Sequence, residues 1–116
     1  MSTEVASSKS AIAPEILEKV KAANPGIETY TAEFSTGAVI LRAPSLPEYR
    51  RFNSMQTTTS GKNMENVETL IRSCILYPDQ DGLTAMFNRQ PALIFKIGDT
   101  AVDLAGASEA VQVKKL

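Results

Sequence analysis

The chain has 116 residues, with 12 lysines and arginines against 13 aspartates and glutamates, one cysteine and no histidine. This length favours one domain, and the even charge argues against nucleic-acid binding, which needs a basic surface to displace counterions from phosphates. No apolar run approaches the ~18–20 residues that span a bilayer, and the polar N-terminus lacks the apolar centre of a signal peptide. A single cysteine cannot form an internal disulfide, so we expect a soluble protein of a reducing compartment without a membrane partner.

The first periodic pattern follows a polar, Ser-rich segment, residues 1–11, which we expect to be a flexible arm. Over residues 12–23 apolar side chains recur at helical spacing, while glutamates and lysines occupy the other side. Pro14 suits the first turn of a helix, where its missing N–H is not needed. The sequence Asn-Pro-Gly at residues 24–26 ends the helix, because Asn and Gly tolerate left-handed dihedrals.

A β-hairpin is predicted next, because the hydrophobic period changes from helical spacing to two. Residues 30–34 alternate between apolar and polar side chains, as in a half-buried strand. Residues 35–37 predict a short loop with Gly37 at a positive φ, and residues 38–43 predict a second strand rich in β-branched side chains. Two strands alone are marginally stable in water, so helices must cover this hairpin or a partner must extend it.

A capping box predicts the start of the following helix. Ser45 and Glu48 stand three residues apart, so that the hydroxyl and the carboxylate can each accept a hydrogen bond from a free backbone N–H. The amphipathic pattern that follows extends to about residue 56. Residues 57–62 are polar and are expected to form a mobile loop.

A continuous apolar stripe at helical spacing predicts a long helix over residues 64–77. Glu68 and Arg72 lie four residues apart on this pattern, where opposite charges stabilise a helix. Pro78 disfavours helical dihedrals in the residue before it, so we expect the helix to end at about residue 77.

Two helices complete the predicted elements. A short helix over residues 83–88 is expected to be capped by Asp79 or Asp81. The last helix begins at Pro91, and Gly106 is its expected C-cap.

The order of these elements predicts an α+β fold: a mainly helical single domain with one antiparallel β-hairpin and flexible ends. We expect the domain to occupy residues 12–106, between the flexible arm at residues 1–11 and a weakly patterned C-terminal tail at residues 107–116.

Few residues of the chain suit catalysis, because histidine, the usual group that titrates near neutrality, is missing. Cys74 lies on an apolar stripe, so a buried, inert thiol is a simpler interpretation than a nucleophile. Asp79 and Asp81 resemble part of a calcium loop, but its first and twelfth positions would be Tyr77 and Asn88, neither of them a carboxylate. We therefore expect no enzyme, no metal and no cofactor.

Three arginines form a second candidate site. Arg42, Arg50 and Arg51 could gather beside Glu48 near the end of the hairpin. Such a cluster could bind a phosphate or a carboxylate. A solvated helix face is the commoner outcome of the same pattern.

The last predicted helix is apolar on more than one side, because Phe95 and Val102 lie half a turn from its main apolar line. A helix that is apolar most of the way round is buried, either within its own fold or against another chain. Met86 and Phe87 shortly precede this helix. We therefore name four candidate partner contacts: Met86, Phe87, Phe95 and Val102.

Four short motifs follow one another in a characteristic order: LRAPSLPEYRRF (residues 41–52), LIRSCILYPD (70–79), QPALIFKIG (90–98) and VDLAG (102–106). This order, over residues 13–106, resembles the small tail assembly chaperones of tailed bacteriophages. In that family a strand with an Arg/Pro/Ser-type ending precedes a helix, and a helix with a Cys-Val/Ile-x-x-Pro ending precedes two more helices.

The resemblance implies a non-enzymatic assembly factor of the host cytoplasm. Members of the family coat the mostly helical tape measure protein, keep it soluble and help recruit tail tube subunits. Our leading hypothesis is therefore a chaperone that binds apolar helical segments of tape measure protein and self-associates. The first alternative is a structural virion component of the tail, baseplate or neck. An enzyme and a nucleic-acid regulator are disfavoured by the missing histidine and the even charge.

Overall fold

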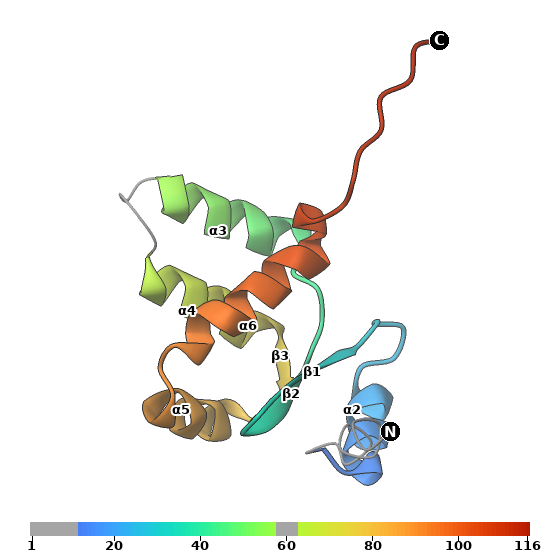
Figure 1. Ribbon diagram of the computed structural model, residues 1–116. Helices are drawn as coiled ribbons and strands as arrows, with labels where there is room; N and C mark the ends of the chain where they lie inside the picture. The colour runs from blue at the N-terminus through green and yellow to red at the C-terminus, as the bar shows by residue number, and fades with distance from the viewer. Residues whose placement is uncertain (1–11, 58–62) are drawn as a thin grey trace.

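The computed structural model describes residues 12–57 and 63–116, and Figure 1 shows how their helices and strands are arranged. The predicted arm at residues 1–11 and most of the predicted loop at residues 57–62 lie outside these ranges. In chain order the elements are α2 (Pro14–Ala23), β1 (Tyr30–Phe34), β2 (Gly37–Leu41), α3 (Leu46–Thr57), α4 (Met64–Cys74), β3 (Ile75–Tyr77), α5 (Gln80–Arg89), α6 (Leu93–Val102) and a closing π-helical turn, η1 (Asp103–Ala107).

The three strands form one antiparallel sheet in the order β1-β2-β3. The hairpin register pairs Tyr30 with Leu41 and Phe34 with Gly37, and β3 pairs with the far end of β2. β2 is therefore the central strand, and its residues 38–41 are all buried.

The sheet separates two apolar clusters, because alternate side chains of β2 point to opposite faces. On one face Ala38 and Ile40 pack with Ile12 and the apolar side of α2. On the other face Val39 and Leu41 join the main core, which is made by α3, α4, α5 and α6. Figure 1 shows α2 on one side of β1 and β2, with α3, α4, α5 and α6 on the other side.

The α+β prediction is confirmed, and so is the hairpin, but the predicted helix over residues 64–77 is wrong at its end. The helix ends at Cys74, where Ile75 takes extended dihedrals of φ −74° and ψ 126°, and residues 75–77 form β3. The apolar stripe continues through both elements, so hydrophobicity alone does not mark the change. Pairing with β2 replaces the last helical turn and gives the hairpin its third strand.

The predicted positive φ at Gly37 is also wrong. The positive φ angles of the described glycines occur at Gly26 (77°) and Gly106 (104°). Gly37 instead begins β2 and pairs with Phe34, leaving a two-residue turn at Ser35 and Thr36. Gly106 takes the left-handed backbone typical of a C-cap, but it lies inside η1, and the caps are Asp103 for α6 and Ser108 for η1, so the C-cap expected at Gly106 is wrong.

Local hydrogen bonds confirm two of the predicted helix caps, although α5 begins at Gln80 rather than at residue 83, and α6 begins at Leu93 rather than at Pro91. The Glu48 N–H donates to the Ser45 hydroxyl at 3.3 Å, and the Ser45 N–H donates to a Glu48 carboxylate oxygen at 2.8 Å, which completes the capping box. Asp79 caps α5 by accepting a hydrogen bond from the Gly82 N–H at 2.8 Å. Within residues 12–57 and 63–116 there is no helix whose length and apolarity would let it cross a membrane.

Candidate functional site

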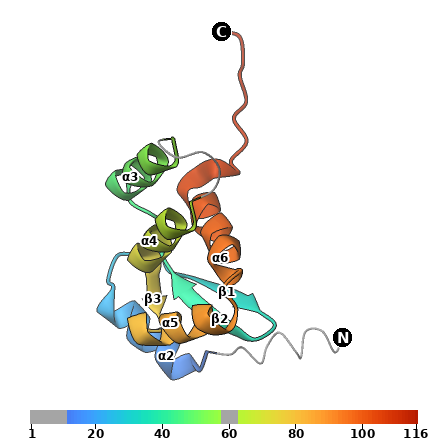
Figure 2. The same ribbon diagram turned by 90° about the vertical axis from the view of Figure 1, so that its left-hand side faces the viewer.

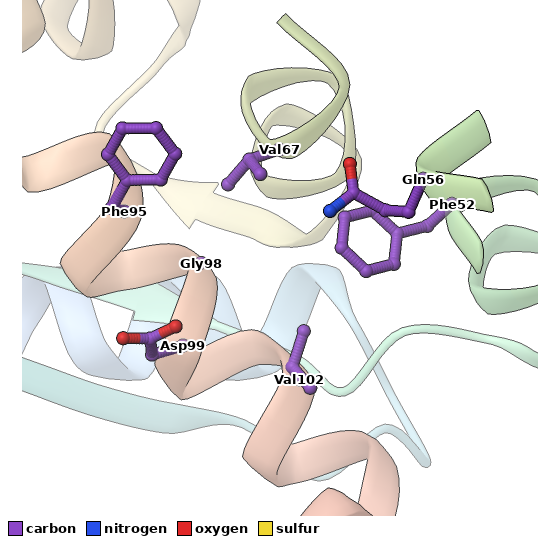
Figure 3. Close-up of a pocket in the computed structure, with 7 residues that line it drawn as sticks. All are labelled: Phe52, Gln56, Val67, Phe95, Gly98, Asp99 and Val102. Atoms are coloured by element: carbon purple, nitrogen blue, oxygen red, sulfur yellow. The ribbon is translucent and has the colours of Figure 1, made fainter. Parts of the chain in front are cut away.

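An apolar groove lies where three helices meet, and Figure 3 shows the residues around it. Its cavity has a volume of about 60 Å³. α3 contributes two of the lining side chains, α4 contributes one, and α6 supplies the remaining wall. The lining residues are Phe52, Gln56, Val67, Phe95, Gly98, Asp99 and Val102.

The floor of the groove is set by a close approach between α4 and α6 at Gly98. A Cβ atom at this position would stand 2.5 Å from the Val67 Cγ1 atom, which is closer than real Cβ contacts allow. Glycine therefore lets α6 approach the Val67 side chain, although glycine is an unfavourable residue within a helix. Both residues are buried, and the neighbouring Phe95 and Val102 remain half-buried at the rim.

The buried side-chain amide of Asn66 holds α3 in place against α4 at the groove. The Asn66 Nδ2 group donates hydrogen bonds to the Phe52 carbonyl oxygen and to Gln56 Oε1, both at 3.0 Å. Asn66 is 4% exposed, and its Oδ1 atom has no hydrogen-bond partner among the described residues. These bonds tie the first turn of α4 to the last turns of α3, and so they position the Phe52 ring beside Val67.

Exposed apolar side chains also lie on α3 and α4, two of the three helices that form the groove. Leu46 on α3 is 61% exposed, and Met55 on α3 and Met64 on α4 are each 41% exposed. Methionine is flexible and polarisable, so it adapts to partners of different shape. None of these three side chains lines the groove itself, and Met55 lines a separate cavity with Arg51 and Thr69.

The four predicted partner contacts do not form one surface. Phe95 and Val102 line the groove, seven residues apart on the same face of α6. Phe87 is 5% exposed and belongs to the main core, with the Arg72 guanidinium 5.7 Å from its ring centre. Met86 is half-buried and packs against that core. Contact of any of the four with a partner stays a prediction.

The predicted cluster of three arginines does not form, and Arg42 instead makes an ion pair with Glu48. Arg42 donates to both carboxylate oxygens of Glu48 at 2.9 Å and to the Ser73 carbonyl oxygen at 2.7 Å. The hydrogen bond from Arg42 holds the pKa of Glu48 at about 2, well below its usual value. Arg50 and Arg51 are exposed on α3. Arg42 therefore clamps α3 to the end of α4, and its guanidinium is occupied by these protein acceptors.

Cys74 is fully buried, as the sequence predicts. Burial raises the pKa of its thiol to about 11, so the thiol is protonated at neutral pH. Asp79 serves as an N-cap, as the simpler interpretation of the Asp-Gln-Asp-Gly segment requires. In the part of the chain that the structure describes, no three potential metal ligands gather.

The sequence matches a protein family over residues 19–114, which include every residue of the groove. The family is described as a domain of unknown function, DUF6848. The chain belongs to this family. The groove is thus a feature of a DUF6848 domain, built from helices that all lie within the matched segment.

A solved structure shares the fold of this DUF6848 domain. It is that of an uncharacterised protein, rbstp2171, from Bacillus stearothermophilus, at a TM-score of 0.67 and 19% sequence identity. The alignment covers 84% of this chain and 99% of that protein. At this identity the likeness concerns the fold alone. No curated protein sequence matches the chain.

Proposed function

We propose that this DUF6848 protein is a tail assembly chaperone of a tailed bacteriophage, which acts in the host cytoplasm on the tape measure protein. The order of the sequence motifs suggests this function. The structural observation on which the proposal depends is the groove between α3, α4 and α6. In this proposal the groove binds apolar helical segments of the client, and the bound chaperone helps recruit tail tube subunits.

The dimensions of the groove suit a side chain of a partner protein. Pockets for small molecules typically have volumes of about 300–1,000 Å³. The cavity here has about 60 Å³, enough for the end of one aliphatic side chain. An amphipathic helix binds such a groove with apolar anchors at positions i, i+3, i+4 and i+7. One anchor enters the cavity, and the others lie against the half-buried Phe95 and Val102 at its rim.

The chemistry of the groove supports reversible binding. Each fully buried leucine-sized anchor contributes about 1.5–3 kcal/mol, from which the entropic cost of association is subtracted. Asp99 is the charged residue of the lining and is exposed, so no buried ion pair strengthens the contact. A chaperone that leaves its client before the particle is complete needs binding of this moderate strength.

Co-expression with the tape measure protein encoded in the same genome tests this proposal. We expect the wild-type chain to raise the soluble fraction of the tape measure protein. Val102→Asp places a charge at the half-buried rim of the groove and should abolish the effect. Ala105→Asp adds the same charge at an exposed position three residues further on and is the matched control.

Two results would contradict the proposal. One is an unchanged soluble fraction of the tape measure protein in the presence of the wild-type chain. The other is an equal loss of the solubilising effect in both variants when circular dichroism shows them to be equally folded.

Mass spectrometry of purified particles addresses the alternative, a structural subunit of the tail, baseplate or neck. The chaperone is expected to be missing from particles, whereas a subunit is present at fixed stoichiometry.

A further inference from the structure

The C-terminal segment of the chain extends away from the domain. We call residues 110–116 the C-terminal arm. It leaves the end of η1 and points away from the other elements in both views (Figures 1 and 2). All its residues are exposed, and Val111 and Val113 are 86% and 93% exposed. The two valines alternate with Gln112 and Lys114, which is the pattern of a strand with one apolar face.

The sheet offers an open edge that such a strand fits. β1 is a terminal strand of the sheet and pairs with β2 alone. In an antiparallel pair, alternate residues direct their backbone N–H and C=O groups away from the partner strand. The outer side of β1 therefore carries backbone groups without a sheet partner among the described residues, which makes it a template for another strand. β3, at the opposite edge, is three residues long against five in β1.

The two faces of β1 match the two faces of the arm. Ala32 and Phe34 are half-buried and pack against the main core. A strand added beside them with Val111 and Val113 on the same face would continue this apolar surface. Each valine would then lose the water that now surrounds it, and this burial favours association in proportion to the apolar area covered.

The charges of the two segments are opposite. Residues 27–34 contain Glu28 and Glu33 and no lysine or arginine, whereas the arm contains Lys114 and Lys115 and no acidic residue. Glu33 is exposed, and it lies on the face of β1 that the polar side chains of an added strand would share. Electrostatic attraction therefore favours the arm as the occupant of this edge.

The geometry points to a new interface: the C-terminal arm of one copy adds as a fourth strand to the β1 edge of a second copy. The arm points away from its own domain, which favours a second copy over its own edge. Arm and edge are different surfaces, so the contact joins copies head to tail, or closes a dimer when two copies exchange arms. This interface is separate from the groove, and it stands whether or not the groove binds a tape measure protein.

Sedimentation equilibrium of the purified full chain over a range of concentrations tests this inference. We expect concentration-dependent association in the wild type and a monomer after deletion of residues 110–116. Val111→Asp combined with Val113→Asp should also give a monomer, because it removes the apolar face of the arm. Ser108→Asp adds a negative charge just outside the arm, at an exposed position, and should leave association unchanged.

A charge exchange separates pairing from any effect on folding. Glu33→Lys alone, and Lys114→Glu with Lys115→Glu, should each raise the dissociation constant about fivefold or more. The three changes together should restore association to near the wild-type level. A wild type that stays monomeric at every concentration, an undiminished association after deletion of the arm, or a failure of the exchange to restore it would each overturn the inference.

Discussion

Gly98 lies so close to Val67 that the effect of a Gly98→Ala substitution on stability should depend on the side chain at residue 67. Gly98→Ala places a methyl group 2.5 Å from the Val67 Cγ1 atom, while the next nearest contact, the Ile71 Cδ1 atom, is at an ordinary 3.8 Å. Alanine is favoured over glycine within a helix by about 0.5–1 kcal/mol. Overpacking of a closely packed core costs about 1–3 kcal/mol. We therefore expect Gly98→Ala to lower the free energy of unfolding by about 0.5–2 kcal/mol in the wild-type background.

The same change should stabilise the protein once Val67 is shortened. Val67→Ala removes the Cγ1 atom, and by itself it should cost about 1–3 kcal/mol through lost burial and a cavity. In that background the added methyl of Gly98→Ala meets no close atom and partly fills the space. We expect it to raise the free energy of unfolding by about 0.5–1 kcal/mol, the helix-propensity difference alone.

Urea unfolding, followed by far-UV circular dichroism, measures this coupling. The four proteins compared are the wild type, the two single variants and the double variant. The double-mutant cycle should give a coupling energy of about 1–3 kcal/mol. Equal effects of Gly98→Ala in both backgrounds would refute the reasoning, because they would show that α4 and α6 do not meet through these two residues.

The remaining predictions concern the ion pair, the thiol and a helix cap. The pKa of Glu48 is lowered to about 2, so its contribution is present above its ordinary pKa of 4.5 and is lost as the pH falls towards 2. Since about a quarter of its side chain is exposed, we expect a loss of about 1–2 kcal/mol over this window. Glu48→Gln should flatten that part of the stability profile, and an unchanged profile would contradict the ion pair. The Cys74 thiol, with a pKa of about 11, should react with a thiol reagent at pH 8 only after denaturation, and rapid labelling of the folded protein would contradict its burial. Cys74→Ser should cost about 1 kcal/mol in the free energy of unfolding and leave function intact, because it buries a hydroxyl. Asp79→Ala should cost about 1 kcal/mol in thermal unfolding by removing the N-cap of α5, whereas the exposed neighbour Asp81→Ala should have a smaller effect.

Local signals in the sequence predicted most of the fold. The capping box at Ser45 and Glu48, the alternation over β1 and the Asn-Pro-Gly stop after α2 depend on a few adjacent residues, and each marks an element that the structure contains. Local chemistry decides such features, so they can be recognised without knowledge of the rest of the molecule.

β3 could not be predicted in the same way, because its three residues continue the apolar stripe of α4. Pairing with β2, which lies more than thirty residues earlier in the chain, decides its extended conformation. Short strands of this kind depend on tertiary contacts more than on their own propensity.

The groove itself was not predicted from the sequence, although two of its residues were named as candidate partner contacts. The two-sided apolar pattern of α6 pointed to Phe95 and Val102, and both line the groove. Phe52 and Val67 were not singled out, because each belongs to an amphipathic pattern that also fits an ordinary core. Asn66 was missed because the sequence gives no sign that this polar residue is buried. An available signal was Gly98, a glycine within a helical pattern, which usually has a packing reason.

The central claim is that the groove between α3, α4 and α6 binds apolar helical segments of the tape measure protein. The most direct test is a titration of the isotope-labelled chain with peptides that cover the helical regions of that client, followed by methyl and amide chemical shifts. The account predicts saturable shifts concentrated at Val67, Phe95 and Val102, and their loss in the Val102→Asp variant. No saturable shift with any peptide, or shifts gathered on α2 and α5 with the groove unaffected, would contradict it.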